Sequence, residues 1–496
     1  MNMKLPSFFI LLTLTLLVLI QSDTTIDFTS SGSGYTVTSN NITISTAGTY
    51  VLSGSQTNKK IMVSSASTLN LNSFSLINSG SLPPIVISSN QAVTMVLSGT
   101  STLQDSSSNE KDGVIYLESG ASLTISGTGT LNINPYKLMA INGTDGTSLT
   151  VSGGPTITVS SSSSSAGGKY LRDSITFNNA VYTYSCTSGT NHALDTEGDI
   201  KIIKGTYRLT PGNGKGIQAE NNVYIGEESG DNSDLTLTIT TSNEGIEAKG
   251  IEIYSGKITV NAEEDGINAA AAGSECDENV GCSGNCECYI KFTGGSLTLT
   301  SGEDGLDANG DIFISGGDII VFAASSSENQ PIDQDGLLSI TGGNIIAAGS
   351  SSMGGISATD SQNHATYSGS ISKGSAIEVI NSNSNDILLS LEAPKEANYA
   401  YFSFPSAFTA NLDGTQIATS TTGSSSNGGN SPIGPPGGSD RPNPNEPSTT
   451  SKATTSTDNT GSDTVEDTDD DPTVISTNQK YVKLSGIIGI LLIILI

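Results

Sequence analysis

The chain has 496 residues, of which 14% are charged and 5% are aromatic, and it contains no tryptophan. Its formal net charge is −29 and its pI is about 4.1, so its surface repels nucleic acid and attracts cations. We expect no nucleic-acid partner, and the few aromatic residues argue against a broad aromatic platform for stacking sugars.

The N-terminal segment, residues 1–22, has one basic residue, Lys4, before an apolar run from Phe8 to Ile20. Polar residues follow this run, a pattern typical of a secretory signal peptide that is excluded from the fold. We therefore expect the mature chain to be extracellular. In a secreted chain, the Asn-x-Thr motifs that begin at Asn41 and Asn142 are candidate N-glycosylation sites.

Residues 23–190 already contain short strands. The segment from Leu123 to Ile133 reads L-x-I-S-G-x-G-x-L-x-I, and Leu149 to Val159 has a similar pattern. Alternation of apolar and polar residues with period two, broken by glycine, indicates β-strands and turns.

The clearest repeat lies between Gly245 and Gly343. Gly245 to Gly256 and Gly305 to Gly316 share one frame, apolar-x-small, a turn, and then I-x-I before a glycine. A repeat of this size cannot bury its apolar face alone, so copies must stack. We predict an all-β fold, a single-stranded right-handed parallel β-helix over residues 23–420, with a β-propeller as the alternative. A leucine-rich repeat is excluded because no helical segment separates the strands.

Acidic residues recur at the turn that precedes several copies of the repeat. Aligning the glycines places Glu244, Asp265 and Asp304 in one column, and Glu247, Asn268, Asp307 and Asp333 in a second. Turns of a β-helix lie about 4.8 Å apart, so these carboxylates would repel one another unless a cation lies between them.

Oxygen ligands without a nearby thiolate or several histidines favour Ca²⁺. We therefore predict a calcium site formed by Glu244, Glu247, Asp265, Asn268, Asp304 and Asp307. The alternative is a solvated acidic turn in which these side chains make local hydrogen bonds.

Four of the five cysteines, Cys276, Cys282, Cys286 and Cys288, lie in one polar insertion. In a secreted chain the first interpretation is two disulfides that brace a loop, and the second is a zinc site. Cys186 is left over, as a free thiol or a partner in an intermolecular bond.

The C-terminal part changes character twice. Residues 370–420 are richer in aromatic residues, which fits a cap that closes the end of the solenoid. Residues 421–480 are rich in Ser, Thr, Pro and Asp, which predicts a disordered stalk. Residues 481–496 form an apolar tail that is too short to span a bilayer as a helix. This tail resembles a glycosylphosphatidylinositol-attachment signal, so we expect the extracellular face of the plasma membrane; a short membrane anchor is the alternative.

Catalytic residues are less evident than the acidic columns. Lys201, Lys204, Arg208, Lys215 and Lys249 form no recognisable basic group near the carboxylates. His192 is a candidate base, although a lone histidine is more often structural, and His364 has no visible partner. A lyase or hydrolase therefore stays an alternative, and we name no catalytic residue.

The run from Val93 to Asp105, the phrase Leu123 to Ile133, and the acidic turns at Asp265 and Asp304 resemble the bacterial cell-surface carbohydrate-binding domain family. The resemblance covers roughly residues 25–415. It implies a calcium-containing right-handed parallel β-helix, similar in shape to polysaccharide lyases, that binds acidic pectic polymers and cellulose. It also implies a calcium-ligand role for Asp265, Asn268, Asp304 and Asp307. The sequence departs from this pattern in its cysteine loop, its stalk, and Glu244 in place of the usual Asp.

These observations leave three functional hypotheses. The first is a surface-anchored protein that binds polysaccharide, acidic and pectin-like or cellulose, with calcium. The second is a polysaccharide lyase or hydrolase of the same fold. The third is a surface coat or adhesin in which calcium only stiffens the solenoid.

Overall fold

The computed structural model describes residues 23–422, except 80, 82, 106–110, 112, 137–138, 162–168, 187–188, 229–233, 271–286 and 327. Every regular element within these limits is a β-strand. Accordingly, the described residues include no helix of the length and apolarity needed to cross a membrane.

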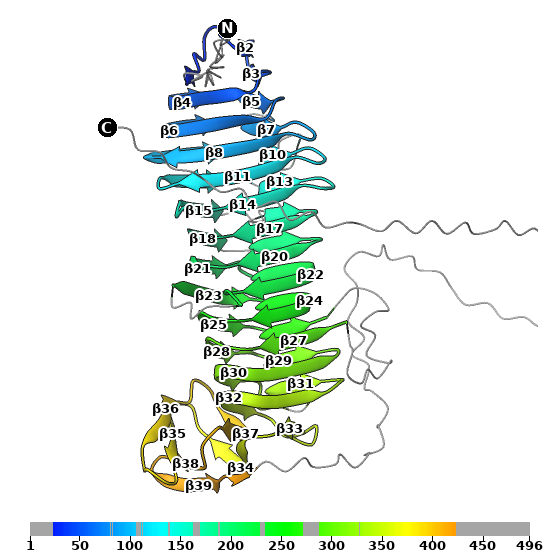
Figure 1. Cartoon of the computed structure of the whole chain (residues 1–496), viewed down its shortest axis with the longest axis vertical. Coiled ribbons are helices and arrows are strands. Elements are labelled where there is room, and N and C mark those ends of the chain that lie inside the picture. Colours follow the sequence, from blue (N-terminus) through cyan, green and yellow to red (C-terminus); the bar gives the residue numbers. More distant parts are fainter. Residues whose placement is uncertain are drawn as a thin grey trace, which may run out of the picture. The chain divides into compact units, whose positions relative to one another are not determined.

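Most strands pair in parallel with the strand one turn later, so the chain forms a β-solenoid of about 11 turns (Figure 1). The predicted parallel β-helix is therefore confirmed. Each turn passes through three faces, which we call sheets 1, 2 and 3, and long strands such as β6 continue from sheet 1 into sheet 3.

Sheet 1 stacks β4 (Gly48–Thr57), β6 (Ser67–Ile77), β8 (Ala92–Ser98), β11 (Ser122–Gly127), β14 (Ser148–Val151), β17 (Ser174–Phe177), β20 (Asp199–Ile202), β22 (Ile217–Ile225), β24 (Ile246–Ile253), β27 (Tyr289–Phe292), β30 (Asp311–Phe322), β32 (Leu338–Gly349) and β33 (Thr359–Asp360). β1 (Thr24–Thr25) pairs with β4.

Sheet 2 stacks β3 (Asn41–Ile44), β5 (Lys60–Val63), β7 (Ile85–Ile87), β10 (Gly113–Leu117), β13 (Met139–Gly143), β16 (Lys169–Leu171), β19 (Leu194–Thr196), the first parts of β22 and β24, β26 (Ile267–Ala269), β29 (Leu306–Ala308) and β31 (Ile332–Gln334). β2 (Tyr35–Val37) pairs with β3 in antiparallel fashion.

Sheet 3 stacks the second parts of β4 and β6, then β9 (Thr100–Gln104), β12 (Thr130–Asn134), β15 (Thr156–Ser161), β18 (Ala180–Cys186), β21 (Gly205–Thr210), β23 (Leu235–Ser242), β25 (Lys257–Ala262), β28 (Ser296–Thr300) and the second parts of β30 and β32.

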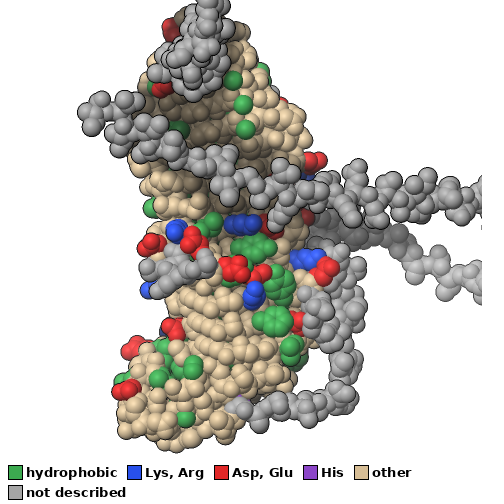
Figure 2. All heavy atoms as spheres, viewed as in Figure 1, with side chains coloured by type: hydrophobic (Ala, Val, Ile, Leu, Met, Phe, Trp, Pro, Cys, Tyr) green, Lys and Arg blue, Asp and Glu red, His purple; other side chains and the backbone are tan. Residues whose placement is uncertain are grey.

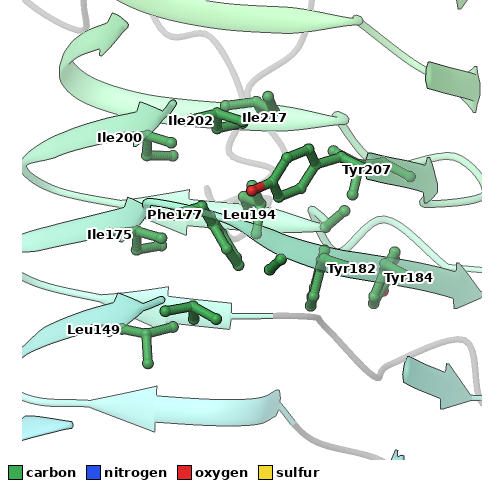
Figure 3. Close-up of a cluster of buried hydrophobic side chains, with 14 of the residues drawn as sticks. Leu149, Ile175, Phe177, Tyr182, Tyr184, Leu194, Ile200, Ile202, Tyr207 and Ile217 are labelled. Carbon is green, nitrogen blue, oxygen red and sulfur yellow. The ribbon is translucent and has the colours of Figure 1, made fainter. Parts of the chain in front are cut away.

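The core consists of inward-facing columns of Ile, Leu, Val and aromatic side chains. Period-two alternation sends every second residue inward, and the parallel register stacks each of these on its equivalent one turn away. Figure 3 shows a central section, in which the ring centroid of Phe177 lies 5.3 Å from that of Tyr182 and 5.2 Å from that of Tyr207. Because the strands are fixed by this core, the outward residues also form columns.

The glycine of each acidic turn is required by packing. A Cβ atom on Gly305 would lie 2.2 Å from Cγ1 of Val321 and 2.4 Å from the carbonyl oxygen of Pro331. Gly245 is equally crowded, because its Cβ would lie 2.3 Å from Cγ1 of Val260. The missing side chain lets the turn approach sheet 3 closely, which fixes the position of the acidic residue before it.

After the last parallel turn the chain forms antiparallel strands. β34 (Asn363–Ile371) and β32 both pair with β37 (Ala397–Phe404), and β40 (Thr421–Thr422) pairs with β34. A second sheet has the order β36 (Ile387–Glu392), β35 (Ala376–Asn381), β38 (Phe408–Leu412) and β39 (Thr415–Thr419). Their apolar core includes Phe322 and Ile346 of the solenoid, so β37 covers the edge that β32 would otherwise expose.

Several sequence predictions fall on residues outside the described part of the chain. These are the signal peptide (1–22), the stalk beyond residue 422, the apolar tail (481–496), and the cysteines Cys276, Cys282 and Cys286. Cys288 is described and buried. Cys186 is also buried, with 2% of its surface exposed, which fits a core thiol better than an intermolecular bond.

Candidate functional site

The second acidic column lies on the outer face of sheet 2. The strand register places Glu247 beside Asn268, Asn268 beside Asp307, and Asp307 beside Asp333 on successive turns. The same column continues towards the N-terminus through Gln218 and Asp195. The stacking that the glycine alignment predicted is thus observed. We use the name acid ladder for this column and the row of turn residues beside it, which the next paragraph describes.

The residues of the first acidic column stack in the turns that lead into these strands. The amide of Gly245 donates to the carbonyl oxygen of Asp265, and the amide of Gly266 donates to that of Asp304. The equivalent bonds, from Gly216 to Glu244 and from Gly305 to Gln330, extend the column. The acid ladder therefore has two parallel rows, which are listed here in order of stacking: His192, Lys215, Glu244, Asp265, Asp304 and Gln330, and Asp195, Gln218, Glu247, Asn268, Asp307 and Asp333.

Lys215 lies within the acid ladder, so the absence of a nearby basic group that we inferred from sequence was wrong. Its Nζ lies 3.3 Å from Oε2 of Glu244 and also forms an ion pair with Glu247. All three side chains are at most 20% exposed. Lys215 occupies the position one turn before Glu244, and the sequence analysis missed this because the turn at Lys215 has a lysine where the later turns have an acid. At this end of the ladder, a lysine already provides the positive charge between two carboxylates.

At the other end of the acid ladder, no described lysine forms an ion pair with the carboxylates, and these carboxylates are hard to ionise. Burial, reinforced by the neighbouring acids, raises the pKa of Asp265 to about 6 and that of Asp304 to about 7. Burial also raises the pKa of Asp307 well above its usual range, with Asp265, Asp304 and Asp333 adding to the shift. The pKa of Asp333 is raised by burial as well.

Hydrogen bonds between successive turns account for part of this arrangement. The amide of Asp304 donates to Oδ1 of Asp265 over 2.9 Å, and the amide of Gln330 donates to Oδ1 of Asp304. Each aspartate thereby accepts from the backbone of the equivalent position one turn later, so these bonds join successive turns and differ from the local bonds of the alternative interpretation. These bonds lower the pKa values but do not offset burial. Asn268 Oδ1, in contrast, is buried and accepts no hydrogen bond.

The side chains of the acid ladder suit a hard cation, because they offer carboxylate and amide oxygens as ligands. One of these, the amide oxygen of Asn268, accepts no hydrogen bond. Within the part of the chain that the structure describes, no three His, Cys, Asp or Glu side chains converge as a group that could hold a metal ion. The potential ligands instead succeed one another along the ladder. The calcium site formed by Glu244, Glu247, Asp265, Asn268, Asp304 and Asp307 stays a prediction.

His192 stands at the N-terminal end of the first row. Its Nδ1 accepts a hydrogen bond of 3.0 Å from the amide of Lys215 on the next turn. Burial, helped by the charge of Lys215, lowers the pKa of His192 to about 4, so the ring is neutral at pH 7. The contact gives His192 a structural role in holding two turns together.

His364 has two partners, contrary to the expectation from sequence. Its Nδ1 lies 3.9 Å from Oδ2 of Asp360, and its ring stacks on that of Tyr401 with centroids 6.2 Å apart. Tyr401 donates from its hydroxyl to the same Oδ2 over 2.6 Å. His364 and Tyr401 line a pocket of about 500 Å³ near the C-terminal antiparallel strands, far along the chain from the acid ladder.

The two predicted N-glycosylation sites, Asn41 and Asn142, lie outside the acid ladder. Asn41 begins β3 and is exposed, whereas Asn142 is half-buried on the outer face of sheet 2. Use of either as a glycan acceptor stays a prediction.

A group of side chains that the sequence analysis did not identify lies on the outer face of sheet 1. Tyr224, Tyr254, Tyr289 and Phe313 are all half-buried and come from consecutive turns. Figure 2 shows hydrophobic side chains with basic and acidic ones gathered over the middle of the solenoid. The low aromatic content had argued against such a platform, but composition says nothing about clustering. Outward positions in the strand alternation were the signal that could have revealed it.

Comparison with known proteins identifies one family. The sequence model of the family described as carbohydrate-binding domain-containing protein matches residues 38–232 and 232–393, which together make up more than half of the chain. No curated protein and no solved structure matches.

Proposed function

Since the chain belongs to the carbohydrate-binding domain-containing protein family, we propose that it is a secreted, surface-anchored protein that binds an acidic, pectin-like polysaccharide along sheet 2 with calcium. The family match supports carbohydrate binding. The acid ladder supports the finer proposal about the acidic polymer and the cation.

The observation that carries this proposal is the run of oxygen side chains on consecutive turns from Glu244 to Asp333. A linear polysaccharide repeats its carboxylate groups along one axis, and the ladder repeats its own along the solenoid. Because both are negative, they repel each other unless cations lie between them. The buried carboxylates with raised pKa values are the groups that would gain most from such a cation.

The residues that would hold calcium are Asp265, Asn268, Asp304 and Asp307. Bound calcium would supply positive charge and open coordination positions for uronate carboxylates. Glu244 and Glu247 are less suited to this role than the sequence implied, because both already form an ion pair with Lys215.

Secretion and surface anchoring are proposed from sequence patterns alone. The segment 1–22 would direct export, and the tail 481–496 would be exchanged for a lipid anchor after residues 421–480. The stalk would hold the solenoid away from the extracellular face of the plasma membrane. Appearance of the protein in the medium after phosphatidylinositol-specific phospholipase C treatment of expressing cells would support this arrangement, and retention on the cells would count against the lipid anchor.

The test of glycan binding compares polygalacturonate affinity in calcium and in EDTA for the unsubstituted protein and for the double variant Asp304→Asn with Asp307→Asn. We expect binding in calcium only, and loss of binding in the double variant. Asp318→Asn is the matched control, because Asp318 is an exposed acid on sheet 3 that accepts a hydrogen bond from Asn344. Equal affinity in calcium and EDTA, or an unaffected double variant, would overturn the proposal.

Two further measurements on the same protein samples distinguish the two alternative functions, an enzyme and a surface coat or adhesin. A lyase or hydrolase would release unsaturated or reducing ends from polygalacturonate. A coat or adhesin would show a higher melting temperature in calcium without binding any glycan.

A further inference from the structure

The outer face of sheet 1 carries four aromatic side chains within the same turns as the acid ladder. Strand pairing places Tyr224 beside Glu252, Glu252 beside Lys291, and Lys291 beside Phe313 on successive turns. Tyr254 follows Glu252 by two residues, and Tyr289 precedes Lys291 by two, so these rings flank the central column. We call Tyr224, Tyr254, Tyr289 and Phe313 the aromatic platform.

Two of the three tyrosine hydroxyl groups of the platform are held in place by hydrogen bonds to Glu252 at its centre. Tyr254 donates to Oε2 of Glu252 and Tyr289 donates to Oε1, both over 2.8 Å. Lys291 Nζ lies 3.0 Å from Oε2 of the same carboxylate. Burial and the adjacent Glu252 raise the pKa values of Tyr254 and Tyr289, so both remain protonated donors. Rings that are fixed in this way lose little conformational entropy when a ligand covers them.

Gly250 allows the ring of Tyr289 to lie against the strand. A Cβ atom on Gly250 would lie 2.8 Å from Cε1 and 2.9 Å from Cζ of Tyr289, so the ring occupies the space above the glycine. Asn222 and Tyr289 are the strand neighbours of Gly250 on either side. Glycine at position 250 thus allows the half-buried ring of Tyr289 to stay beside its neighbouring strand.

A polar pocket of about 360 Å³ continues this surface towards the N-terminus. Its lining includes Ser174, Thr176, Asp199 and Lys201, which are on sheet 1. The ammonium group of Lys201 lies 5.2 Å from the ring centroid of Tyr224, so this lysine joins the pocket to the platform. The surface thus offers stacking faces beside hydrogen-bonding groups along one line of turns.

We propose that the aromatic platform and the adjoining pocket form a second glycan-binding surface that takes a neutral polysaccharide without calcium. Pyranose rings present flat C–H faces that stack on aromatic rings, and their hydroxyl groups match the serine, threonine and charged side chains nearby. The central acid, Glu252, is paired with Lys291, so the platform lacks the uncompensated negative charge of the acid ladder. Four turns at about 4.8 Å spacing match the length of a short oligosaccharide segment.

This inference rests on the proposed carbohydrate-binding function but assigns it a second surface and a second ligand class. A protein partner would also bury aromatic residues. The glycan is favoured because the rings are spread along the solenoid axis, as a linear polymer requires, and because the family match is to carbohydrate binding.

The test measures the affinity of the full chain for cellohexaose in EDTA by isothermal titration calorimetry. We expect Tyr289→Ala and Phe313→Ala each to weaken binding by about tenfold, the loss that corresponds to one stacking contact. Gly250→Ala should weaken it as well, because the added methyl group displaces the ring of Tyr289. Tyr136→Ala is the matched control, since Tyr136 is 50% exposed and lies outside the platform.

The outcomes separate the platform from the acid ladder. Cellohexaose affinity that falls in the platform variants, while calcium-dependent polygalacturonate binding and the melting temperature persist, supports the inference. Unchanged cellohexaose affinity in both alanine variants would overturn it, as would the absence of cellohexaose binding by the unsubstituted chain in EDTA. Neither result would affect polygalacturonate binding in calcium, so the proposed function is judged separately. Should the variants instead lose only binding to a protein, the platform is a protein-docking surface and the inference is wrong.

Discussion

The outer faces of sheets 1 and 2 differ in how they compensate charge, although the same turns form both. On sheet 1, the carboxylate of Glu252 receives two tyrosine hydroxyls and a lysine, and its pKa falls below the usual value because these bonds outweigh burial. On sheet 2, Asp304 and Asp307 receive too few donors, and burial raises their pKa values. The solenoid scaffold therefore does not determine the chemistry of a face, which depends on the outward residue that each turn supplies.

This contrast continues within sheet 2 itself. At the N-terminal end of the acid ladder Lys215 offsets part of the negative charge, whereas the end around Asp307 depends on protonation or on a cation from solution. We therefore expect the two ends to respond oppositely when charge is removed.

The largest effect should come from Lys215→Ala, which leaves Glu244 and Glu247 without their shared cation. Because all three side chains are mostly buried, the free energy of unfolding should fall by about 3 kcal/mol. Urea denaturation at pH 7 in EDTA measures this loss. Lys249→Ala is the control, since its partner Glu287 is 57% exposed and the ion pair contributes less than about 1 kcal/mol. Equal losses in the two variants would show that Lys215 does not neutralise a buried pair.

A smaller effect of opposite sign is expected for Asp304→Asn. The pKa of Asp304 is about 7 in the folded chain and 3.8 in its reference state, so the folded state binds the proton more tightly. Without metal, the contribution of Asp304 to stability is therefore full below pH 4 and is lost as the pH rises to about 7. Asparagine has no charge to bury and can still accept the bond from Gln330. The variant should be more stable by about 1 to 2 kcal/mol at pH 8 in EDTA, and unchanged at pH 4.

Calorimetric melting curves at the two pH values check this prediction, with Asp318→Asn as the control because Asp318 is exposed on sheet 3. A variant that is less stable at pH 8 would mean that the ionised carboxylate is already compensated. In calcium the sign should reverse, because the unsubstituted chain then gains a cation that the variant holds less tightly.

The sequence predicted the fold well because a solenoid has local periodicity that is repeated many times. The glycines of the acidic turns set the alignment, and the same glycines pack against sheet 3, so the stacking of Glu247, Asn268 and Asp307 followed from the alignment of the glycines. No long-range topology had to be guessed.

Contacts between turns of unequal length were harder to predict. The loop between Tyr254 and Tyr289 differs in length from the other turns, which hid the grouping of the aromatic rings. The ion pair of Lys215 was hidden because its turn has a lysine where the later turns have an acid. The partners of His364 come from β33 and β37, and the antiparallel pairing of β37 with β34, the strand that carries His364, lies outside the repeat. Periodicity thus predicts which residues face outward, while loop lengths decide which of them meet.

The smallest effect on stability should come from the platform. Tyr254→Phe combined with Tyr289→Phe removes two hydroxyl donors from Glu252 but keeps both ring faces and the ion pair with Lys291. Each lost bond costs about 1 kcal/mol or less at such a partly exposed site. Cellohexaose affinity should fall less than in Tyr289→Ala, because the stacking surfaces remain and only their orientation is loosened. If the double variant instead bound as weakly as Tyr289→Ala, the hydroxyl groups and not the ring faces would be the main contacts, and the contrast between a stacking face and a charged face would have to be abandoned.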